Sequence, residues 1–254
     1  MYITKDIIYV YDGSFDGFLC CVYESVYGKE IPAEILTDEE LDISFYVPRT
    51  ILTDAERASR VYVSLDVKIC LEARELIETV FLSNLSNKEI SLLRFILFAY
   101  KNGAKVLQML SHPIVNPILM AEKGLRNEAH LLLGFLRFQD VGGALVATIS
   151  PQNYVLPFIR HHFCTRFANE DFLIFDDVHH AALIYENGVA KIAAIDSITA
   201  PTQGIIEKRY QNLWKQFYHT ISITSRENKR CRMTHCPKHF WGNMTEMPDI
   251  AKNK

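Results

Sequence analysis

The sequence predicts an α+β protein in which helices pack against an antiparallel sheet of about five strands, with a mainly helical N-terminal layer before it. Helical periodicity dominates residues 54–130, and short apolar runs divided by glycine turns follow it. The 254 residues are 49% hydrophobic and 22% charged, which suffices for a sizeable core. We predict a mainly helical region with one strand over residues 1–125 and an α+β region over residues 126–250, which could also form one continuous domain.

The N-terminal region begins with its one predicted strand, Ile7–Tyr11, after which Asp12-Gly13 turns the chain. Ser14 is suited to cap the helix that follows, because its hydroxyl can accept a hydrogen bond from a backbone N–H of the first turn. Apolar residues recur on one face of this helix, and their spacing predicts that it ends at about Tyr27. A second clear helix covers Glu89–Tyr100, where apolar residues recur at i, i+3, i+4 spacing.

Strand patterns replace helical ones near residue 130. The predicted strands Leu131–Gln139 and Ala144–Ser150 flank Gly142-Gly143, which predicts a hairpin. A helix should follow over residues 153–167. Three further apolar runs are predicted as strands: Phe172–Phe175, Ala181–Tyr185 and Ala190–Ile195. A long helix over residues 202–220 then leads into the C-terminal segment.

The two ends of the chain carry opposite charge. Residues 1–59 contain 12 acidic and 4 basic side chains, whereas residues 208–239 contain 8 basic side chains and one acidic. The net charge of −3 conceals this asymmetry, which is typical of a chain with a polyanion-binding end.

Aromatic residues alternate with the cations of the basic segment. Cations that contact phosphates, combined with aromatic rings that stack on bases, are the usual means of binding a single strand. The alternative is that these rings are core, and helical spacing favours this for Tyr210, Leu213, Trp214 and Phe217. The polar residues that we single out for nucleic-acid contact are Arg137, Arg166, Arg226, Asn228, Lys229, Arg230, Arg232 and Lys238.

A second group of polar residues lies beside the predicted sheet. Glu128 and Arg137 bracket its first strand, His162 and Arg166 lie on the next helix, and Asp176 ends a strand. If these side chains line a cleft, then Glu128, His162 and Asp176 are the candidates for acid–base catalysis. The competing interpretation is a buried ion-pair network that joins helix to sheet.

Metal and cofactor motifs are weak in this sequence. Cys231, His235, Cys236 and His239 place four potential zinc ligands within nine residues. Structural zinc sites usually space two ligand pairs around a longer loop, and Pro237 interrupts this cluster, so we predict no cofactor. The chain lacks Gly-x-Ser-x-Gly, a phosphate-binding P-loop and the Cys-x-x-x-Cys-x-x-Cys of radical-SAM enzymes.

Several segments spread over nearly the whole chain form a more specific signature. They are YDGSFDGF at 11–18, NEAHLLLGFLRF at 127–138, HFCTRF at 162–167, FDD at 175–177, LWKQFY at 213–218, SREN at 225–228 and PKHFWGNMTE at 237–246. In this order they resemble a bacterial family labelled "probable DNA metabolism protein", which is built on a domain of unknown function.

Individual positions match that family's pattern. They are Asp12, Gly13, Gly17, Glu128, Arg137, His162, Arg166, Asp176, Arg226, Asn228, Pro237, Trp241 and Glu246. We expect a structural role for Asp12, Gly13, Gly17, Trp214, Pro237 and Trp241. The sequence departs from the family at His179, where an arginine is usual, and at Cys236, where a methionine is usual. The first departure argues against a fixed salt bridge to Asp176.

The resemblance implies an accessory protein that works beside a radical-SAM protein of DNA modification or repair. A similar domain is joined elsewhere to uracil-DNA-glycosylase-like domains, for which this chain leaves no room. No catalytic residues follow from the resemblance. Three hypotheses remain: a nucleic-acid-binding module that presents DNA to the partner, an enzyme acting on damaged or modified DNA, and an adaptor whose acidic N-terminal region docks the partner.

The sequence also bears on where the protein works. Its first residues lack the basic and then long apolar layout of a secretory signal. The longest uncharged stretch, residues 141–159, contains Pro151 and Pro157 among several polar residues, so we expect no membrane span and a cytoplasmic protein.

Overall fold

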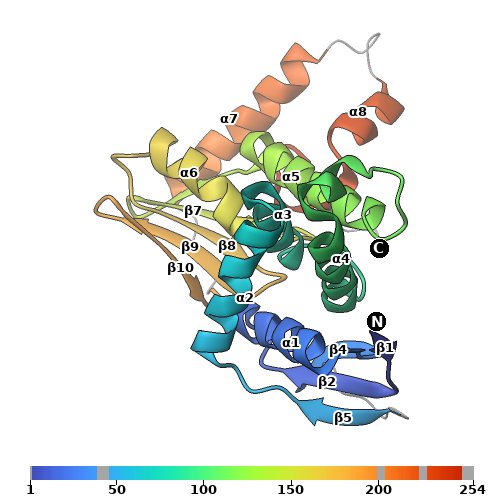
Figure 1. Ribbon diagram of the computed structural model, residues 1–254. Helices are drawn as coiled ribbons and strands as arrows, with labels where there is room; N and C mark the ends of the chain where they lie inside the picture. The colour runs from blue at the N-terminus through green and yellow to red at the C-terminus, as the bar shows by residue number, and fades with distance from the viewer. Residues whose placement is uncertain (1, 39–45, 199–203, 223–227, 248–254) are drawn as a thin grey trace. The chain divides into compact units, whose positions relative to one another are not determined.

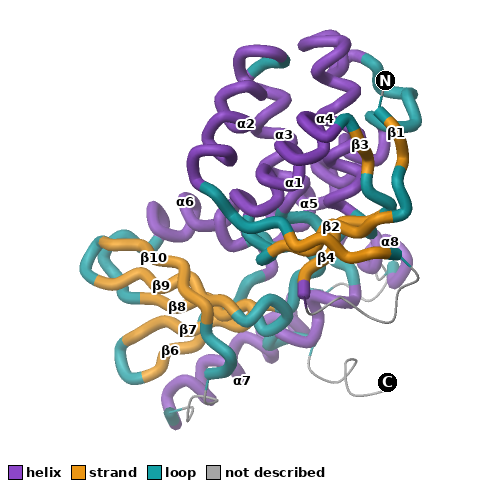
Figure 2. The backbone as a smooth tube through the Cα atoms, turned by 60° about the horizontal axis from the view of Figure 1, so that its bottom comes forward, coloured by secondary structure: helices purple, strands orange, loops and turns teal. Residues whose placement is uncertain are grey.

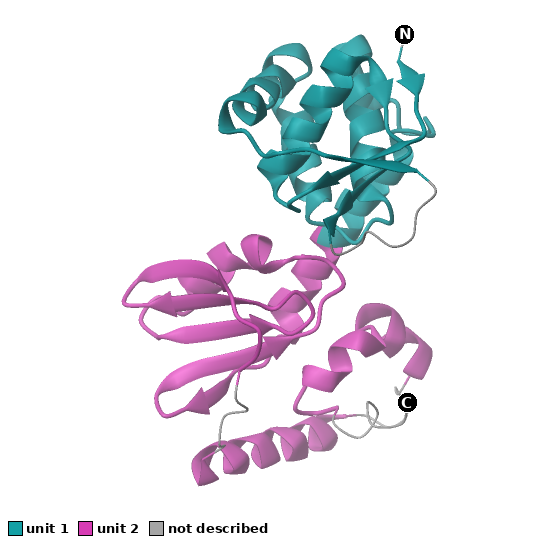
Figure 3. Cartoon of the chain, turned by 90° about the horizontal axis from the view of Figure 1, so that it is seen from below, with its two compact units in different colours: residues 1–125 teal, residues 126–254 magenta. Residues whose placement is uncertain are grey.

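The computed structural model describes residues 2–38, 46–198, 204–222 and 228–247. The chain divides into two compact units, Met1–Leu125 and Arg126–Lys254, each with its own hydrophobic core (Figure 3). Of the helices within the described ranges, none has the length and apolar content that a membrane crossing requires.

The N-terminal unit combines short strands with a set of helices (Figures 1 and 2). Its elements are β1 (Ile3–Thr4), β2 (Ile7–Tyr11), α1 (Phe15–Gly28), β3 (Glu30–Ile31), β4 (Glu34–Thr37), β5 (Val47–Thr50), α2 (Ala55–Lys68), α3 (Leu71–Phe81), α4 (Lys88–Asn102) and η2 (Gly103–Gln108). Helix α5 (Asn116–Phe135) begins in this unit and ends in the next.

The prediction of one strand in this region was wrong, because β2 has strand partners. It is the central strand of a parallel sheet with the order β4-β2-β5, and β1 pairs with β3. Strand β2 is buried and apolar, so its sequence reveals it. The edge strand β5, with the sequence VPRT, is exposed throughout and shows no alternation of apolar and polar residues. Only its pairing with β2 makes it a strand.

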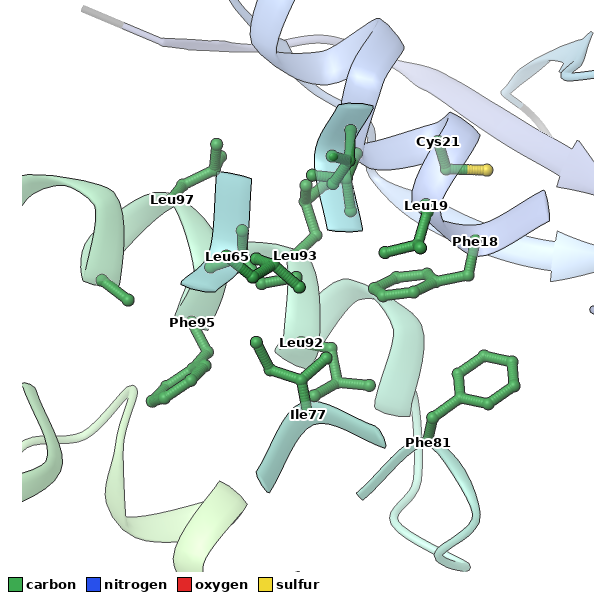
Figure 4. Packing of buried hydrophobic residues seen from close by; sticks show 14 of the residues in the cluster. Phe18, Leu19, Cys21, Leu65, Ile77, Phe81, Leu92, Leu93, Phe95 and Leu97 are labelled. Carbon is green, nitrogen blue, oxygen red and sulfur yellow. The ribbon is translucent and has the colours of Figure 1, made fainter. Parts of the chain in front are cut away.

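The core of the N-terminal unit lies between its helices (Figure 4). Phe18 of α1, Leu65 of α2, Ile77 of α3 and Leu93 of α4 are each fully buried there. These residues fall on the apolar faces that the periodicity of each segment indicates. The predicted helix over Glu89–Tyr100 is confirmed as α4, which extends by one or two residues at each end.

The turn after β2 forms as its residues predict. Ser14 is the N-cap of α1, and its Oγ accepts a hydrogen bond from the Gly17 N–H at 2.9 Å. Asp12 accepts hydrogen bonds from the Ser14 N–H, from Ser14 Oγ and from Thr53 Oγ1. Gly13 has a φ of +78°, which favours glycine. This junction ties the end of β2 to the segment that leads into α2.

The C-terminal unit is built on a five-stranded sheet. After the end of α5 it contains β6 (Gln139–Val141), β7 (Ala144–Ile149), α6 (Leu156–Arg166), β8 (Phe172–Asp176), β9 (Ala181–Glu186), β10 (Val189–Ala194), α7 (Ile205–Ile221), α8 (Lys229–His235) and η4 (Lys238–Asn243). The strand order is β10-β9-β8-β7-β6, which Figure 2 shows from one side.

The predicted five strands with packed helices are confirmed, but the sheet is mixed and not antiparallel throughout. Strands β7 and β8 pair in parallel, whereas the other neighbours are antiparallel. The reason is the connection between them. Parallel neighbours need a crossover, and α6 supplies it.

The prediction of a strand over Leu131–Gln139 was wrong for most of its length. Residues up to Phe135 continue α5, and only Gln139 belongs to β6. Ala129 and Leu132 are buried at helical spacing and so keep the helix in the core. Periodicity alone does not distinguish a strand from a buried helix in a short apolar run.

Candidate nucleic-acid interface

Helix α7 contacts its own unit through polar residues. Its half-buried side chains are Glu207, Gln211, Lys215 and Tyr218, which recur at i, i+4, i+8 and i+11. Glu207 Oε2 accepts a hydrogen bond from the Asp140 N–H at 3.3 Å, which links the helix to β6. The face of α7 toward the sheet therefore combines three hydrophilic side chains with Tyr218, which packs against the hydrophobic core.

Three aromatic residues of α7 are exposed to solvent, whereas Tyr218 packs against the C-terminal core. Tyr210 is 66% exposed, Phe217 52% and Trp214 41%, and Leu213 beside them is 50% exposed. The prediction that these four residues are core was wrong. Spacing shows that a helix has an apolar face, but only tertiary packing decides what covers that face. Trp214 and Phe217 lie 5.7 Å apart between ring centroids and form a continuous aromatic surface.

Cations flank this aromatic surface along the chain. On α7, Lys208 and Arg209 are exposed, as are Lys229 and Arg230 on α8 and Lys238 after it. None of these five makes an ion pair among the residues that the structure describes. Each is therefore available to a phosphate.

Other residues predicted to contact nucleic acid have structural roles. Asn228 is the N-cap of α8, where its Oδ1 accepts a hydrogen bond from the Cys231 N–H at 2.9 Å. The Arg232 guanidinium lies 5.8 Å from the ring centroid of Trp241. Arg226 lies outside the described residues.

Arg137 is held in place by a buried carboxylate. Its Nη2 donates to Glu246 Oε1 at 2.7 Å, and its Nη1 donates to the Gly134 carbonyl at 2.8 Å. Burial raises the pKa of Glu246, but hydrogen bonds from Arg137, from its own backbone N–H and from Trp214, together with the charge of Arg137, outweigh burial, so the pKa lies below its usual value. The same guanidinium lies 5.9 Å from the ring centroid of Trp214. This pair joins the end of α5 to the segment after η4 and to α7.

A pocket of about 570 Å³ lies between the sheet, α7 and the segment around η4. Its lining residues are Arg137, Gln139, Val146, Thr148, Phe175, Asp177, Ile198, Gln211, Lys215, Gly242, Asn243, Met244 and Thr245. The strand residues among them lie on one face of the sheet, because Gln139 pairs with Val146 and Thr148 with Phe175. The opposite face packs on α6 through Ile149 and Ile174.

Glu128 is buried and engaged by backbone. Its carboxylate accepts from the Gln152 N–H at 2.8 Å, from the Asn153 N–H at 2.9 Å and from Asn153 Nδ2 at 2.6 Å. His239 Nε2 lies 3.7 Å from Oε1. These contacts fasten the loop before α6 to α5.

Asp176 is also fully buried and engaged. Its Oδ1 accepts from the Val178 and His179 N–H groups, both at 3.1 Å, and its Oδ2 lies 2.8 Å from His179 Nδ1. The arginine-to-histidine departure from the family pattern thus leaves Asp176 with an imidazole partner. The carboxylate closes the turn between β8 and β9.

His162 and Arg166 lie on α6. His162 is half-buried with its ring against Phe163, and Arg166 is exposed with its guanidinium 5.9 Å from the Phe167 ring centroid. Within the described ranges, no hydrogen bond or ion pair joins either residue to Glu128, Asp176 or Arg137. The described contacts of Glu128 and Asp176 form two separate groups, one with the loop before α6 and one within the turn between β8 and β9.

The potential zinc ligands are spread over different environments. Cys231 and His235 are exposed on α8, while Cys236 is half-buried with its Sγ 3.7 Å from Met244 Sδ. His239 stacks on Phe240. In the part of the chain that the structure describes, no three histidine, cysteine or acidic residues gather as a metal site would require.

Pro237 and Trp241 occupy structural positions. Pro237 precedes η4, and Trp241 is 4% exposed with its Nε1 donating to the Cys236 carbonyl at 2.9 Å. Sequence reasoning missed the pocket residues Thr148, Lys215 and Asn243. The first lies in an apolar strand and the others in segments far away in the chain, so no local pattern connects them.

A family model for a domain of unknown function, DUF4130, matches residues 86–246. This range is more than half of the chain and includes the sheet, α7 and the pocket of the C-terminal unit. A comparison with curated proteins found no match.

Proposed function

The chain belongs to the DUF4130 family, and from this membership and the exposed aromatic face of α7 we propose that it is a cytoplasmic nucleic-acid-binding accessory protein of DNA metabolism or repair. It binds single-stranded DNA and presents it to a radical-SAM partner that supplies the chemistry. The partner and the link to DNA rest on the resemblance of its segments to the "probable DNA metabolism protein" family.

The exposure of Tyr210, Trp214 and Phe217 is the observation that carries the proposal. Exposed aromatic rings offer stacking platforms for bases, whereas a buried ring has no free face on which a base can stack. The cations Lys208 and Arg209 lie on the same helix, where they can contact phosphates while bases stack.

The burial and the hydrogen bonds of the candidate acid–base groups favour binding over catalysis. Glu128 and Asp176 already accept hydrogen bonds from backbone N–H groups and are buried, so substrate would have to displace these contacts to reach them. The proposed role for these carboxylates is to hold the loop before α6 and the turn between β8 and β9 in place.

The stacking role is tested by alanine substitutions on α7. Trp214→Ala should weaken binding of a fluorescent single-stranded oligonucleotide by about 5- to 150-fold, because one stacked base contributes about 1–3 kcal/mol. Leu213→Ala is the matched control, since Leu213 is 50% exposed beside the 41% exposed Trp214 but has no π-system. Fluorescence anisotropy measures both. An equal decrease in affinity for the two variants would show a general apolar contact and contradict stacking.

The phosphate contacts are tested by charge reversal. Lys229→Glu and Arg230→Glu should each reduce the slope of log affinity against log salt, by about 0.7 for every phosphate that the variant no longer binds. Lys123→Glu, an exposed cation of α5, is the control and should leave the slope unchanged. Co-purification with the radical-SAM partner, with and without nuclease, then separates binding through DNA from direct docking.

A further inference from the structure

We infer that the pocket beneath α7 receives one unstacked nucleobase of the bound strand, an inference that rests on the proposed function. Its volume of about 570 Å³ falls in the range of about 300–1,000 Å³ that is usual for small-molecule sites. Every lining residue belongs to the C-terminal unit, so the pocket is complete within one compact body.

The pocket has the mixed lining that a base requires. Val146, Phe175 and Met244 provide apolar surface for the faces of a planar ring. Thr148, Gln211 and Asn243 provide hydroxyl and amide groups for its edge. Amide side chains pair with base edges through one donor and one acceptor, as in the amide–adenine pairing of DNA readout.

Several of these polar atoms are not used by the fold. Asn243 donates to Ser150 Oγ and Gln211 donates to Glu207 Oε1, which leaves the Oδ1 and Oε1 of these amides as acceptors. Within the described ranges, no hydrogen bond involves Thr148 Oγ1. A ligand with N–H groups would satisfy these atoms.

The charges in the pocket favour a base inside and a phosphate at the rim. Arg137 is paired with Glu246, so Lys215 is the lining cation that no described acidic residue neutralises. Asp177, whose Oδ2 accepts from Ser150 Oγ, adds a carboxylate to the lining. A carboxylate repels phosphate but accepts hydrogen bonds from the amino groups of bases.

The pocket also adjoins the aromatic surface of α7. Trp214 is next in sequence to Lys215 of the lining, and its ring lies over Arg137, which also lines the pocket. A strand stacked on Trp214 can therefore place a neighbouring base in the pocket and its phosphate near Lys215. Extruding a base costs least in a strand that is already single or damaged, which suits single-stranded DNA.

The experiment compares an intact oligonucleotide with one that contains a single abasic residue in its centre. In a strand just long enough to cover the interface in one register, wild-type protein should bind the intact strand about tenfold more tightly, because the abasic strand has no base at the central position to insert. Thr148→Phe fills the pocket and should abolish the preference while it keeps the affinity for the abasic strand within about twofold of wild type. Thr165→Phe, an exposed position on α6, is the matched control and should keep the preference.

A second variant guards against misfolding of Thr148→Phe. Gln211→Leu keeps the size of this half-buried side chain of α7 and removes its amide, so it should also reduce the preference. An oligonucleotide with central 2-aminopurine should become less accessible to acrylamide quenching on wild-type protein than on Thr148→Phe. Tight binding of both strands without preference would overturn this inference and leave the proposed function intact. Absence of binding to either strand would overturn both.

Discussion

At the scale of single residues, Gly17 shows most clearly how local chemistry constrains the fold. A Cβ at this position would lie 2.2 Å from Asp12 Oδ1 and 2.9 Å from Thr53 Oγ1. Both atoms belong to the hydrogen-bonded junction between β2, α1 and the segment before α2. The resemblance predicted a structural role for Gly17, and the geometry supplies the reason.

We therefore expect Gly17→Ala to destabilise the protein by about 1–3 kcal/mol, the usual cost of overpacking. Gly124→Ala is the matched control, because a Cβ there meets nothing within 4 Å. In the interior of α5 this control should stabilise the protein by about 0.5–1 kcal/mol. Urea unfolding of both variants measures the difference. A Gly17→Ala variant as stable as wild type would contradict the predicted collision.

The lowered pKa of Glu246 predicts how the stability of the fold depends on pH. Its pKa in the folded protein lies below the usual value of 4.5, which the unfolded chain restores. The unfolded state thus binds the proton more readily, so this group stabilises the fold above about pH 4.5 and ceases to do so as pH falls. Glu246→Gln should flatten the decline of the melting temperature below about pH 4.5. The exposed Glu170→Gln serves as control, and identical acid profiles for the two variants would refute the role of the Arg137–Glu246 pair.

Some residue-scale features could be predicted because they depend on near neighbours. Ser14 was identified as an N-cap because capping involves the next three residues only. The partners of Glu128 could not be identified in this way. They are backbone N–H groups 24 and 25 residues away, which only the folded chain brings to the carboxylate.

At the scale of elements, α7 and η4 contain the two tryptophans of the chain in opposite environments. Trp241 of η4 is 4% exposed in the C-terminal core, whereas Trp214 of α7 is 41% exposed. Both were predicted to be structural. The exposure of Trp214 instead supports its assignment to the proposed interface.

We expect Trp241→Ala to destabilise the protein by about 3–5 kcal/mol, since it removes a buried aromatic side chain. Trp214→Ala should destabilise the protein by less than Trp241→Ala does, because Trp214 is 41% exposed but still contacts Arg137, and it should act mainly on nucleic-acid binding. Chemical denaturation together with anisotropy separates the two effects. If both tryptophans proved equally important for stability, the exposed position of α7 would be refuted.

Two segments of the C-terminal unit show where sequence patterns do not distinguish one secondary structure or strand pairing from another. The apolar pattern of Leu131–Phe135 is compatible with a strand and with a buried helix. These residues continue α5 because Ala129 and Leu132 pack into the core at helical spacing. The parallel pairing of β7 with β8 is likewise a consequence of the α6 crossover. Neither the helical state of Leu131–Phe135 nor the parallel pairing of β7 with β8 follows from the residues of these segments alone.

At the scale of the whole molecule, the two units have separate cores. The core of the N-terminal unit includes Leu93, and that of the C-terminal unit includes Ile159, each fully buried. Helix α5 contributes Ile118 to the first core and Leu132 to the second.

Separate cores predict separate responses to mutation. Leu93→Ala should cost about 2–5 kcal/mol and increase amide hydrogen exchange mainly within residues 1–125. Ile159→Ala should do the same within residues 126–254. Hydrogen exchange with mass spectrometry localises each effect. Equal deprotection of both units by either substitution would show a single cooperative core instead.

The sequence by itself determined which segments are amphipathic, where helices such as α1 begin, the five-stranded sheet with its helices, and the opposite charge of the two ends. These properties depend on residue type and near neighbours. Tertiary structure alone decided the parallel pair in the sheet, the strand partners of β2, the pocket and the exposure of the aromatic face of α7. The reason is that burial and pairing depend on residues that are distant in the chain, and a periodic pattern records that a face is apolar without recording what lies against it.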